Sequence, residues 1–330
     1  MNTSPNLWNG EWTVELATKA ILGADTVKSG LFRVEESIKG ETAIIKTFNY
    51  DADLVEGNFC DDTPTNTSSL ADIAVPMKQF RVYEQPCKSD LINTSYADYM
   101  RNGVFNDSIP QEVLEAFVEK IARVQLKNLE ILRWSGDTAS ASPKRLHQDG
   151  VVKQLLAAAG TVRPTFVAGA LLNPTTVIDE LNKLILNAPV DVRFNPNFSI
   201  VVSPEVLAAY QAAVSSNQAY ATYNVAGMYT IANQQTNAPA YVGQFVGYNV
   251  KMYVATGLSG FNADCAMAMV LTDDMEGNLV LVTDALSDQN NIVIQDRSQT
   301  FMVEQKLDFL WSFRQGIKVL FPEQAVLLHA

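Results

Sequence analysis

The sequence has few of the side chains on which enzymes most often depend. It contains two histidines, His147 and His329, in 330 residues, and neither stands in a pattern that suits a general base. The short motifs of serine hydrolases, dinucleotide-binding proteins, phosphate-binding loops and zinc proteases are absent as well. We therefore predict no catalytic residue and no bound cofactor.

Cysteine is equally scarce. Cys60, Cys87 and Cys265 are odd in number, widely spaced and never part of a Cys-x-x-Cys pair. This pattern indicates free thiols, and neither a disulfide framework nor a zinc site. The acidic residues in 273–278 could form a calcium loop, but the strand-like segments on both sides favour a hairpin turn. We therefore predict no metal site.

Long apolar runs and basic clusters are also missing. No apolar run approaches the roughly 18 residues of a membrane-spanning helix, and the first residues lack the layout of a secretory signal. We expect no membrane association, and folding in a cytoplasm. The net charge of −12 is spread over both halves, and between Arg193 and Arg297 the only basic residue is Lys251. Tight direct binding of nucleic acid would require more basic groups than this.

The sequence does contain enough apolar residues, 47% of the chain, to bury a core in one large domain or two. Residues 1–40 are mixed in pattern and interrupted by glycines, which indicates an extended arm. Residues 42–49 and 73–87 are strand-like, and the stretch 51–72 between them holds six acids and no Lys or Arg. We predict a projecting hairpin with an irregular acidic tip. Loops of this length are usually functional, so we expect this one to lie over a neighbouring subunit.

The clearest predicted helix covers residues 109–134. Ser108 and Gln111 stand at a capping-box spacing, and Pro110 suits the first turn. The apolar residues form a mainly one-sided stripe that broadens towards the end: Leu114, Phe117, Val118, Ile121, Leu129 and Leu132, then Val124, Leu126 and Ile131. At about 1.5 Å per residue the helix would be about 38 Å long, which is typical of a strut. Gly136 after it suits a left-handed cap.

From residue 150 onward the pattern is that of a mixed α/β domain, followed by β structure at the end of the chain. Helices are predicted at residues 151–159, 174–187 and 204–214, the last opened by Ser203 and Pro204. Strands are predicted at residues 198–202, 241–246, 250–255, 266–271, 279–283, 291–295, 300–314 and 325–328. The predicted fold class is therefore α+β.

This order of elements resembles the major capsid protein fold of tailed double-stranded DNA bacteriophages, the Johnson fold of the Hong Kong ninety-seven phage type. LEILRWSGDT at residues 129–138 resembles the end of that family's spine helix, and DGVVKQL at 149–155 resembles the segment leading into its axial domain. FSIVVSPEVL at 198–207, FVGYNV at 245–250 and residues 301–319 are similar to later strands of the family. Each motif is short, and their shared order carries the resemblance.

The resemblance implies a division into domains. Residues 1–40 would be the N-terminal arm, 41–90 the extended β-hairpin loop, 91–149 with 291–330 the peripheral domain with spine helix 109–134, and 150–290 the α/β axial domain. Hexamers and pentamers would assemble in the bacterial host cytoplasm into an icosahedral phage head. The protein would then be part of the virion and contact packaged double-stranded DNA without sequence specificity.

The resemblance also bears on other partners. It implies a portal protein at one vertex and allows for decoration proteins on the outside. Family members with a fused scaffold carry a long, charged, helical N-terminal extension, whereas this sequence starts with the arm. We therefore expect a separate scaffolding protein.

The acidic stretch 51–72 would then contact a basic surface of a neighbour. Its acidic residues are Asp51, Asp53, Glu56, Asp61, Asp62 and Asp72, and the basic candidates on the neighbour's helix are Arg123, Lys127 and Arg133. Some members of the family join subunits through an isopeptide bond from a loop lysine. Here Lys46 and Lys78 lie on the flanking strands, and a tip that holds only acids would keep a nearby amine protonated. We therefore predict noncovalent contacts.

Two alternatives stay open. An encapsulin-like nanocompartment shell protein would have the same kind of fold and would enclose an enzyme cargo in place of a genome. The other alternative is a soluble enzyme with an unrecognised site. The contents of purified particles separate a nanocompartment from a phage shell, and elution as a monomer or small oligomer would indicate an enzyme.

Overall fold

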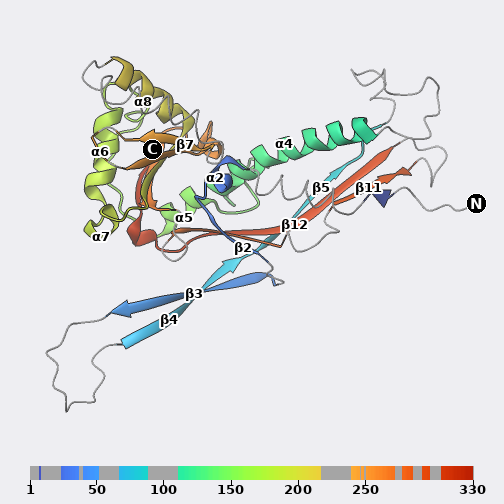
Figure 1. The fold of residues 1–330 in the computed structure, drawn as a ribbon, viewed down its shortest axis with the longest axis horizontal. Coiled ribbons are helices and arrows are strands. Elements are labelled where there is room, and N and C mark those ends of the chain that lie inside the picture. Colours follow the sequence, from blue (N-terminus) through green and yellow to red (C-terminus); the bar gives the residue numbers. More distant parts are fainter. Residues whose placement is uncertain are drawn as a thin grey trace, which may run out of the picture.

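The computed structural model describes residues 7–8, 24–36, 40–51, 67–87, 111–216, 239–245, 247–248, 250–271, 277–284, 292–297 and 306–329. These residues form an elongated body with two sheets, a long helix along it, and a two-stranded ribbon that projects from it (Figure 1). Several predictions fall outside the described residues: most of the arm, the helix start at 108–110, Cys60, and the acidic residues Asp53, Glu56, Asp61 and Asp62.

The first sheet has six described strands, and its central strand is β12 (Leu307–Val319). Three strands pair antiparallel with β12, namely β5 (Lys78–Glu84), β10 (Leu279–Thr283) and β11 (Ile292–Asp296). Two short strands extend the sheet, β1 (Leu7–Trp8) beside β11 and β2 (Arg33–Glu36) parallel to β10. Along the first half of β12 buried and half-buried residues alternate, as expected of a strand with one face on a core.

The second sheet has the strand order β13-β9-β6-β8-β7. The strands are β6 (Phe198–Val202), β7 (Tyr241–Gln244), β8 (Lys251–Val254), β9 (Cys265–Val270) and β13 (Val326–His329). Helices α6 (Val177–Asn187) and α8 (Pro204–Ser216) pack their apolar residues on one face of this sheet, and α7 (Val190–Arg193) follows α6. Ser203 caps α8 as predicted, because its Oγ accepts a hydrogen bond from the Val206 N–H at 3.1 Å.

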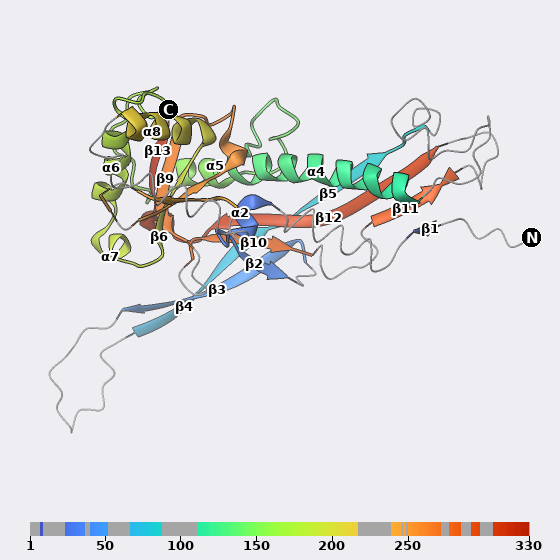
Figure 2. The same cartoon turned by 45° about the horizontal axis from the view of Figure 1, so that its top comes forward.

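Helix α4 (Gln111–Ser135) confirms the predicted strut, and Figure 2 shows it lying alongside the six-stranded sheet. Its last turns are buried on all sides, where it packs against α5 (Val151–Ala157) and the 3-10 turn η2 (Thr256–Leu258). Nearer the start of α4 fewer of its side chains are buried: Ile121 is half-buried, and Val124 is 53% exposed. The side chain of Phe117 lies outside the described residues.

The predicted left-handed cap after α4 is wrong. Gly136 does not have a positive φ. A Cβ at this position would stand 2.2 Å from the carbonyl oxygen of Gln148 and 2.4 Å from that of Leu132. The residue must therefore be glycine because two backbone segments cross there, and the Gly150 N–H donates to the Gly136 carbonyl at 3.0 Å across the crossing.

Residues 24–36 pack into the body, which corrects the prediction that all of residues 1–40 form an extended arm. This segment contains helix α2 (Asp25–Lys28) and strand β2, and Leu31 and Phe32 are almost fully buried. Thr26 donates from its N–H and its Oγ1 to Oε1 of Glu130 on α4, at 3.3 and 2.6 Å. The partners that bury this segment come from distant parts of the chain, so its local pattern did not reveal them.

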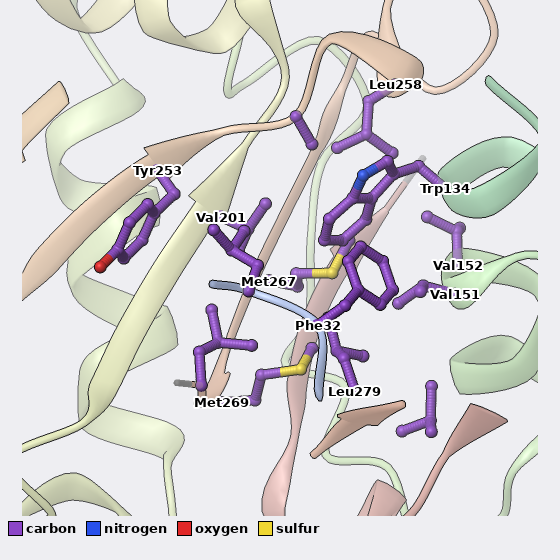
Figure 3. Packing of buried hydrophobic residues seen from close by; sticks show 14 of the residues in the cluster. Phe32, Trp134, Val151, Val152, Val201, Tyr253, Leu258, Met267, Met269 and Leu279 are labelled. Carbon is purple, nitrogen blue, oxygen red and sulfur yellow. The ribbon is translucent and has the colours of Figure 1, made fainter. Parts of the chain in front are cut away.

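The same segment belongs to an apolar cluster that joins the two sheets. Figure 3 shows Phe32 and Trp134 beside Met267 of β9 and Leu279 of β10. The rings of Phe32 and Trp134 meet edge to face, with 5.3 Å between their centroids. Because one cluster includes residues of both sheets, the sheets share a core at the point where they meet.

The sheets join strands from different parts of the domain division that the resemblance implies. That division assigns β5 to the extended loop and β10 to the axial domain, and both strands pair with β12. It assigns β13 to the peripheral domain, and β13 pairs with β9 in the five-stranded sheet. The division itself stays a prediction. The hairpin predicted around residues 273–278 is wrong, because β9 and β10 belong to different sheets. Strand type is a local property, whereas the choice of partner depends on segments far along the chain.

Candidate assembly interface

The ribbon consists of β3 (Thr42–Asp51) and β4 (Thr67–Pro76). The strands pair antiparallel from Thr42 opposite Pro76 to Asp51 opposite Thr67, and neither pairs with another described strand. Figures 1 and 2 both show the ribbon projecting away from the sheets. The structure confirms two strands around the acidic loop, but the second differs from its prediction. The predicted strand 73–87 divides at Met77 into β4 and β5, and β4 begins at Thr67, within the stretch predicted as loop.

One face of the ribbon packs on the six-stranded sheet at the end nearest the body, here called the root. The buried contacts join Ala43, Ile45 and Val75 of the ribbon, and Met77 next to it, to Val280, Val282 and Leu320 of the body. Ile73 packs partly against the same cluster. Because these contacts lie at the root, we expect the body to fold without the far part of the ribbon.

The opposite face of the ribbon is exposed and partly apolar. Ile44 is 63% exposed and stands opposite Ala74, which is exposed as well. Asp72 lies on β4, where the strand register places it opposite Lys46 of β3. It is therefore part of the ribbon and not of the acidic tip. A two-stranded ribbon is marginally stable in water by itself, and an exposed apolar side chain adds to this instability. Both features indicate a surface that another chain covers.

Helix α4 carries two of the three predicted basic contacts on its surface. Arg123 and Lys127 are exposed, and Arg123 pairs with Glu119 at 3.2 Å. Arg133 is not a surface residue, which corrects the third candidate. It is fully buried, and its Nε and Nη2 donate to Gln315 Oε1 at 3.2 and 2.9 Å. Because α5 and η2 pack around the end of α4, they bury a side of the helix that its sequence pattern predicts to be exposed.

Glu130 and Arg133 form a buried pair of opposite charges at the end of α4. Burial raises the pKa of Glu130, while the charge of Arg133 and the hydrogen bonds from Thr26 lower it. Burial lowers the pKa of Arg133 to about 10, while Glu130 acts in the opposite direction. Removing one member of such a pair typically destabilises a protein by about 3–5 kcal/mol. Both charged side chains therefore lie in the interior of the subunit and not on its surface.

A groove of about 460 Å³ opens between β5, α4 and the turn at residues 143–147. Consecutive residues of β5 line it, from Gln79 to Glu84, and face Gln125 and Asn128 of α4. Arg81 and Lys144 bring basic groups to this groove beside the acidic Glu84, although the chain as a whole is acidic. The groove is thus a concave surface with basic groups, bordered by the helix that also carries Arg123 and Lys127.

The titratable groups do not gather into a reactive cluster among the described residues. No group of three or more His, Cys, Asp or Glu side chains there could hold a metal ion, and no described helix is long and apolar enough to cross a membrane. His147 is exposed beside the ring of Phe80. His329 contacts Asn262 Oδ1 through Nε2 at 2.9 Å, and burial lowers its pKa.

Comparison with known proteins relates this geometry to capsids. No protein-family model matches the sequence, and no curated protein matches it. A chain of the satellite phage P4 procapsid, a structure that includes the size determination protein Sid, matches with a TM-score of 0.54 at 11% identity, over 96% of this chain and 98% of its own. The capsid of Ralstonia phage GP4 matches with a TM-score of 0.53 at 11% identity, over 92% of this chain and 88% of its own.

A further structure matches at similar coverage. The virus-like particle from Pyrococcus furiosus has a TM-score of 0.50 at 12% identity, over 96% of this chain and 98% of its own. The chain therefore has the α+β fold of phage capsid proteins, and the fold class predicted from the order of its elements is confirmed. At such low identity the similarity establishes the fold alone.

Proposed function

We propose that this chain is the major capsid protein of a tailed double-stranded DNA phage, a structural protein that assembles with copies of itself into a closed shell. The projecting ribbon carries the proposal, because β3 and β4 pair only with each other among the described strands and expose Ile44. A shell subunit covers such a surface with its neighbour, whereas an isolated subunit leaves it in water. The capsid fold supports the same conclusion.

The same proposal covers the mode of assembly, the partners, and the roles of the ribbon and α4. Hexamers and pentamers form an icosahedral head, with a portal protein at one vertex and a separate scaffolding protein during assembly. The ribbon acts as the extended loop, and α4 acts as the spine helix of a peripheral domain. The net charge of −12 supports contact with packaged DNA that is neither tight nor sequence-specific.

A nanocompartment shell is the second candidate. The similarity to the virus-like particle from Pyrococcus furiosus favours it, because that structure is a virus-like particle and the match covers 98% of its chain. Both candidates require self-assembly, and they differ in what the particle encloses.

Purified chain should therefore assemble. We expect sedimentation velocity to show capsomers or megadalton particles in place of a 36.2 kDa monomer, and electron microscopy of particles from producing cells to show shells that hold DNA. Shells that hold a protein cargo and no DNA would favour the nanocompartment. A chain that remains a monomer at every concentration, in buffer and in extract of producing cells, would contradict both candidates.

We further propose that the acidic loop of one subunit meets the basic side of α4 on its neighbour. Asp51 ends β3 at the far end of the ribbon, so the loop with Asp53, Glu56, Asp61 and Asp62 begins where the ribbon reaches furthest. Arg123 and Lys127 are exposed basic groups on α4, as is Lys120. Contacts between exposed charges are screened by salt, so we expect shells to weaken as the salt concentration rises.

The shell should be held without covalent links between subunits. Lys46 is exposed on β3 but stands opposite Asp72, and no Lys lies in residues 51–72. An amine near several carboxylates stays protonated and is a poor nucleophile. After boiling in detergent, mature particles should give a single band near 36.2 kDa on a denaturing gel. A ladder of multimers would contradict this prediction.

A further inference from the structure

The chain passes between its two sheets twice, and the two connecting segments, here called crossings, lie side by side. The chain leaves the five-stranded sheet after β9 and reaches β10 through Asn278; it later returns from β12 to β13 through Leu320, Phe321 and the turn η4 (Pro322–Gln324). The Leu320 N–H donates to the Asn278 carbonyl at 2.9 Å. This bond joins the outgoing crossing to the returning one.

The side chain of Asn278 holds the returning crossing as well. Its Nδ2 donates to the Phe321 carbonyl at 2.7 Å, and its Oδ1 accepts from the Phe321 N–H at 2.7 Å. One side-chain amide thus makes the pair of bonds that a neighbouring strand would make. Asn278 is fully buried, and its own N–H donates to the carbonyl of Val270 at the end of β9. The residue therefore bonds to both sides of the junction.

The side chain of Gln154 on α5 makes a similar pair of hydrogen bonds to the last part of β12. Its Nε2 donates to the Ile317 carbonyl at 2.9 Å, and its Oε1 accepts from the Val319 N–H at 3.0 Å. Strand β5 pairs with β12 only as far as Gln315. Two side-chain amides thus continue the hydrogen bonding of the sheet along the segment that leads to the other sheet.

The root of the ribbon rests on this same segment. Leu320 is buried in the cluster with Val75 and Ala43 of the ribbon, and Phe321 packs against that cluster. A shift of residues 320–321 would therefore move the root of the ribbon. The five-stranded sheet begins again on the other side of the crossing, at β13.

We propose that Asn278 and Gln154 are positioning residues that set the direction of the ribbon relative to the five-stranded sheet. In a subunit whose ribbon covers a neighbour, this direction sets the angle at which adjacent subunits meet. That last step rests on the proposed shell function, whereas the positioning itself concerns the single chain.

Two spin labels can measure this direction in the full chain. Ala71→Cys on β4 and Ala212→Cys on α8 provide exposed attachment points, in a chain that also carries Cys60→Ser and Cys87→Ser. Cys265 is fully buried, and burial raises the pKa of its thiol, so it stays unlabelled. A large excess of unlabelled chain keeps the labels of different subunits apart.

We expect Asn278→Ala to shift the mean distance between the labels and to widen its distribution, and Gln154→Ala to act in the same direction. Thr283→Val is the matched control. It removes a partly buried bond from Thr283 Oγ1 to the Arg314 carbonyl, 3.1 Å long, at the other end of β10. This control should lower stability and leave the distance distribution unchanged, because its bond does not hold the crossing.

Asn278→Asp adds a rescue within one variant. Its carboxylate can still accept from the Phe321 N–H but cannot donate to the Phe321 carbonyl. Protonation restores one donor, and burial raises the pKa of such a carboxyl group. The distribution should therefore be wide at neutral pH and narrow as the pH falls. This variant also keeps the test decisive if Asn278→Ala does not fold.

A folded Asn278→Ala or Asn278→Asp chain with the wild-type distribution would overturn the proposal, as would an equal widening in Thr283→Val. Particle diameters test the last step, since variant shells should be less uniform than wild-type shells. Variant shells as uniform as the wild type would overturn that step. A wild-type chain that never assembles would contradict the shell function and leave the distance result standing.

Discussion

A chain without the acidic loop should fold normally and fail to assemble. The change removes residues 52–66 and places Asn-Gly between Asp51 and Thr67, which stand opposite each other. Asn-Gly is a preferred two-residue turn of antiparallel hairpins, so the pairing of β3 and β4 is kept. We expect the free energy of unfolding to stay within about 0.5 kcal/mol of the wild type, because the buried contacts between ribbon and body lie at the root.

Assembly should fail because the shortened ribbon no longer reaches its neighbour with Asp53, Glu56, Asp61 and Asp62. Sedimentation velocity and electron microscopy measure the loss. A full-length control carries the corresponding Asn and Gln residues in place of these four acids. It keeps the reach of the loop and removes its charge, so we expect weakened assembly that depends less on salt. Normal shells from the shortened chain would contradict a role for the loop, and loss of its folded signal would contradict the position of the root contacts.

The second large effect is expected at Gly257 in η2. A Cβ there would stand 2.0 Å from the Glu130 carbonyl oxygen and 2.9 Å from the Ile131 nitrogen, both backbone atoms of α4. No side-chain rotation can relieve such a clash, so η2 would have to move away from the helix. That movement would also break the bond from Ser135 Oγ to the Gly257 carbonyl, which is 2.7 Å long. We expect Gly257→Ala to lower the free energy of unfolding by about 3 kcal/mol.

Gly260→Ala is the matched control, three residues further along. Gly260 has a φ of +75°, and a Cβ added there would have nothing within 4 Å, so alanine meets open space but must hold a left-handed conformation. That strain costs about 1–2 kcal/mol. Denaturant unfolding of both variants measures the difference. An equal loss at the two positions would show that η2 does not pack tightly on α4.

Local patterns sufficed for most of the elements. The predicted strands 198–202 and 279–283 agree with β6 and β10 residue for residue, because each is a short apolar run between turn residues. The start of α8 followed from Ser203 and Pro204, and α4 from its apolar stripe. The first strand of the ribbon was equally visible, whereas β4 was not, since residues 67–72 were predicted as part of the polar loop and the predicted strand 73–87 also covers β5.

The candidate site was only partly predictable. Exposed Arg123 and Lys127 agree with their place on the polar face of a helix, but Arg133 is enclosed by α5 and η2, which come from later parts of the chain. Asn278 gave no signal at all, since a buried Asn in a crossing looks like any Asn in a turn. Its role depends on Phe321, which lies far along the chain.

The sequence by itself determined most of the helices and strands, and their order was enough to indicate the capsid fold. Only the tertiary structure decided that β5 and β10 join β12, that β13 returns to β9, and that residues 24–36 enter the shared core. The physical reason is the range of the interactions. Backbone propensity, caps and apolar periodicity act within a few residues, whereas strand partners and burial depend on which distant segments come together.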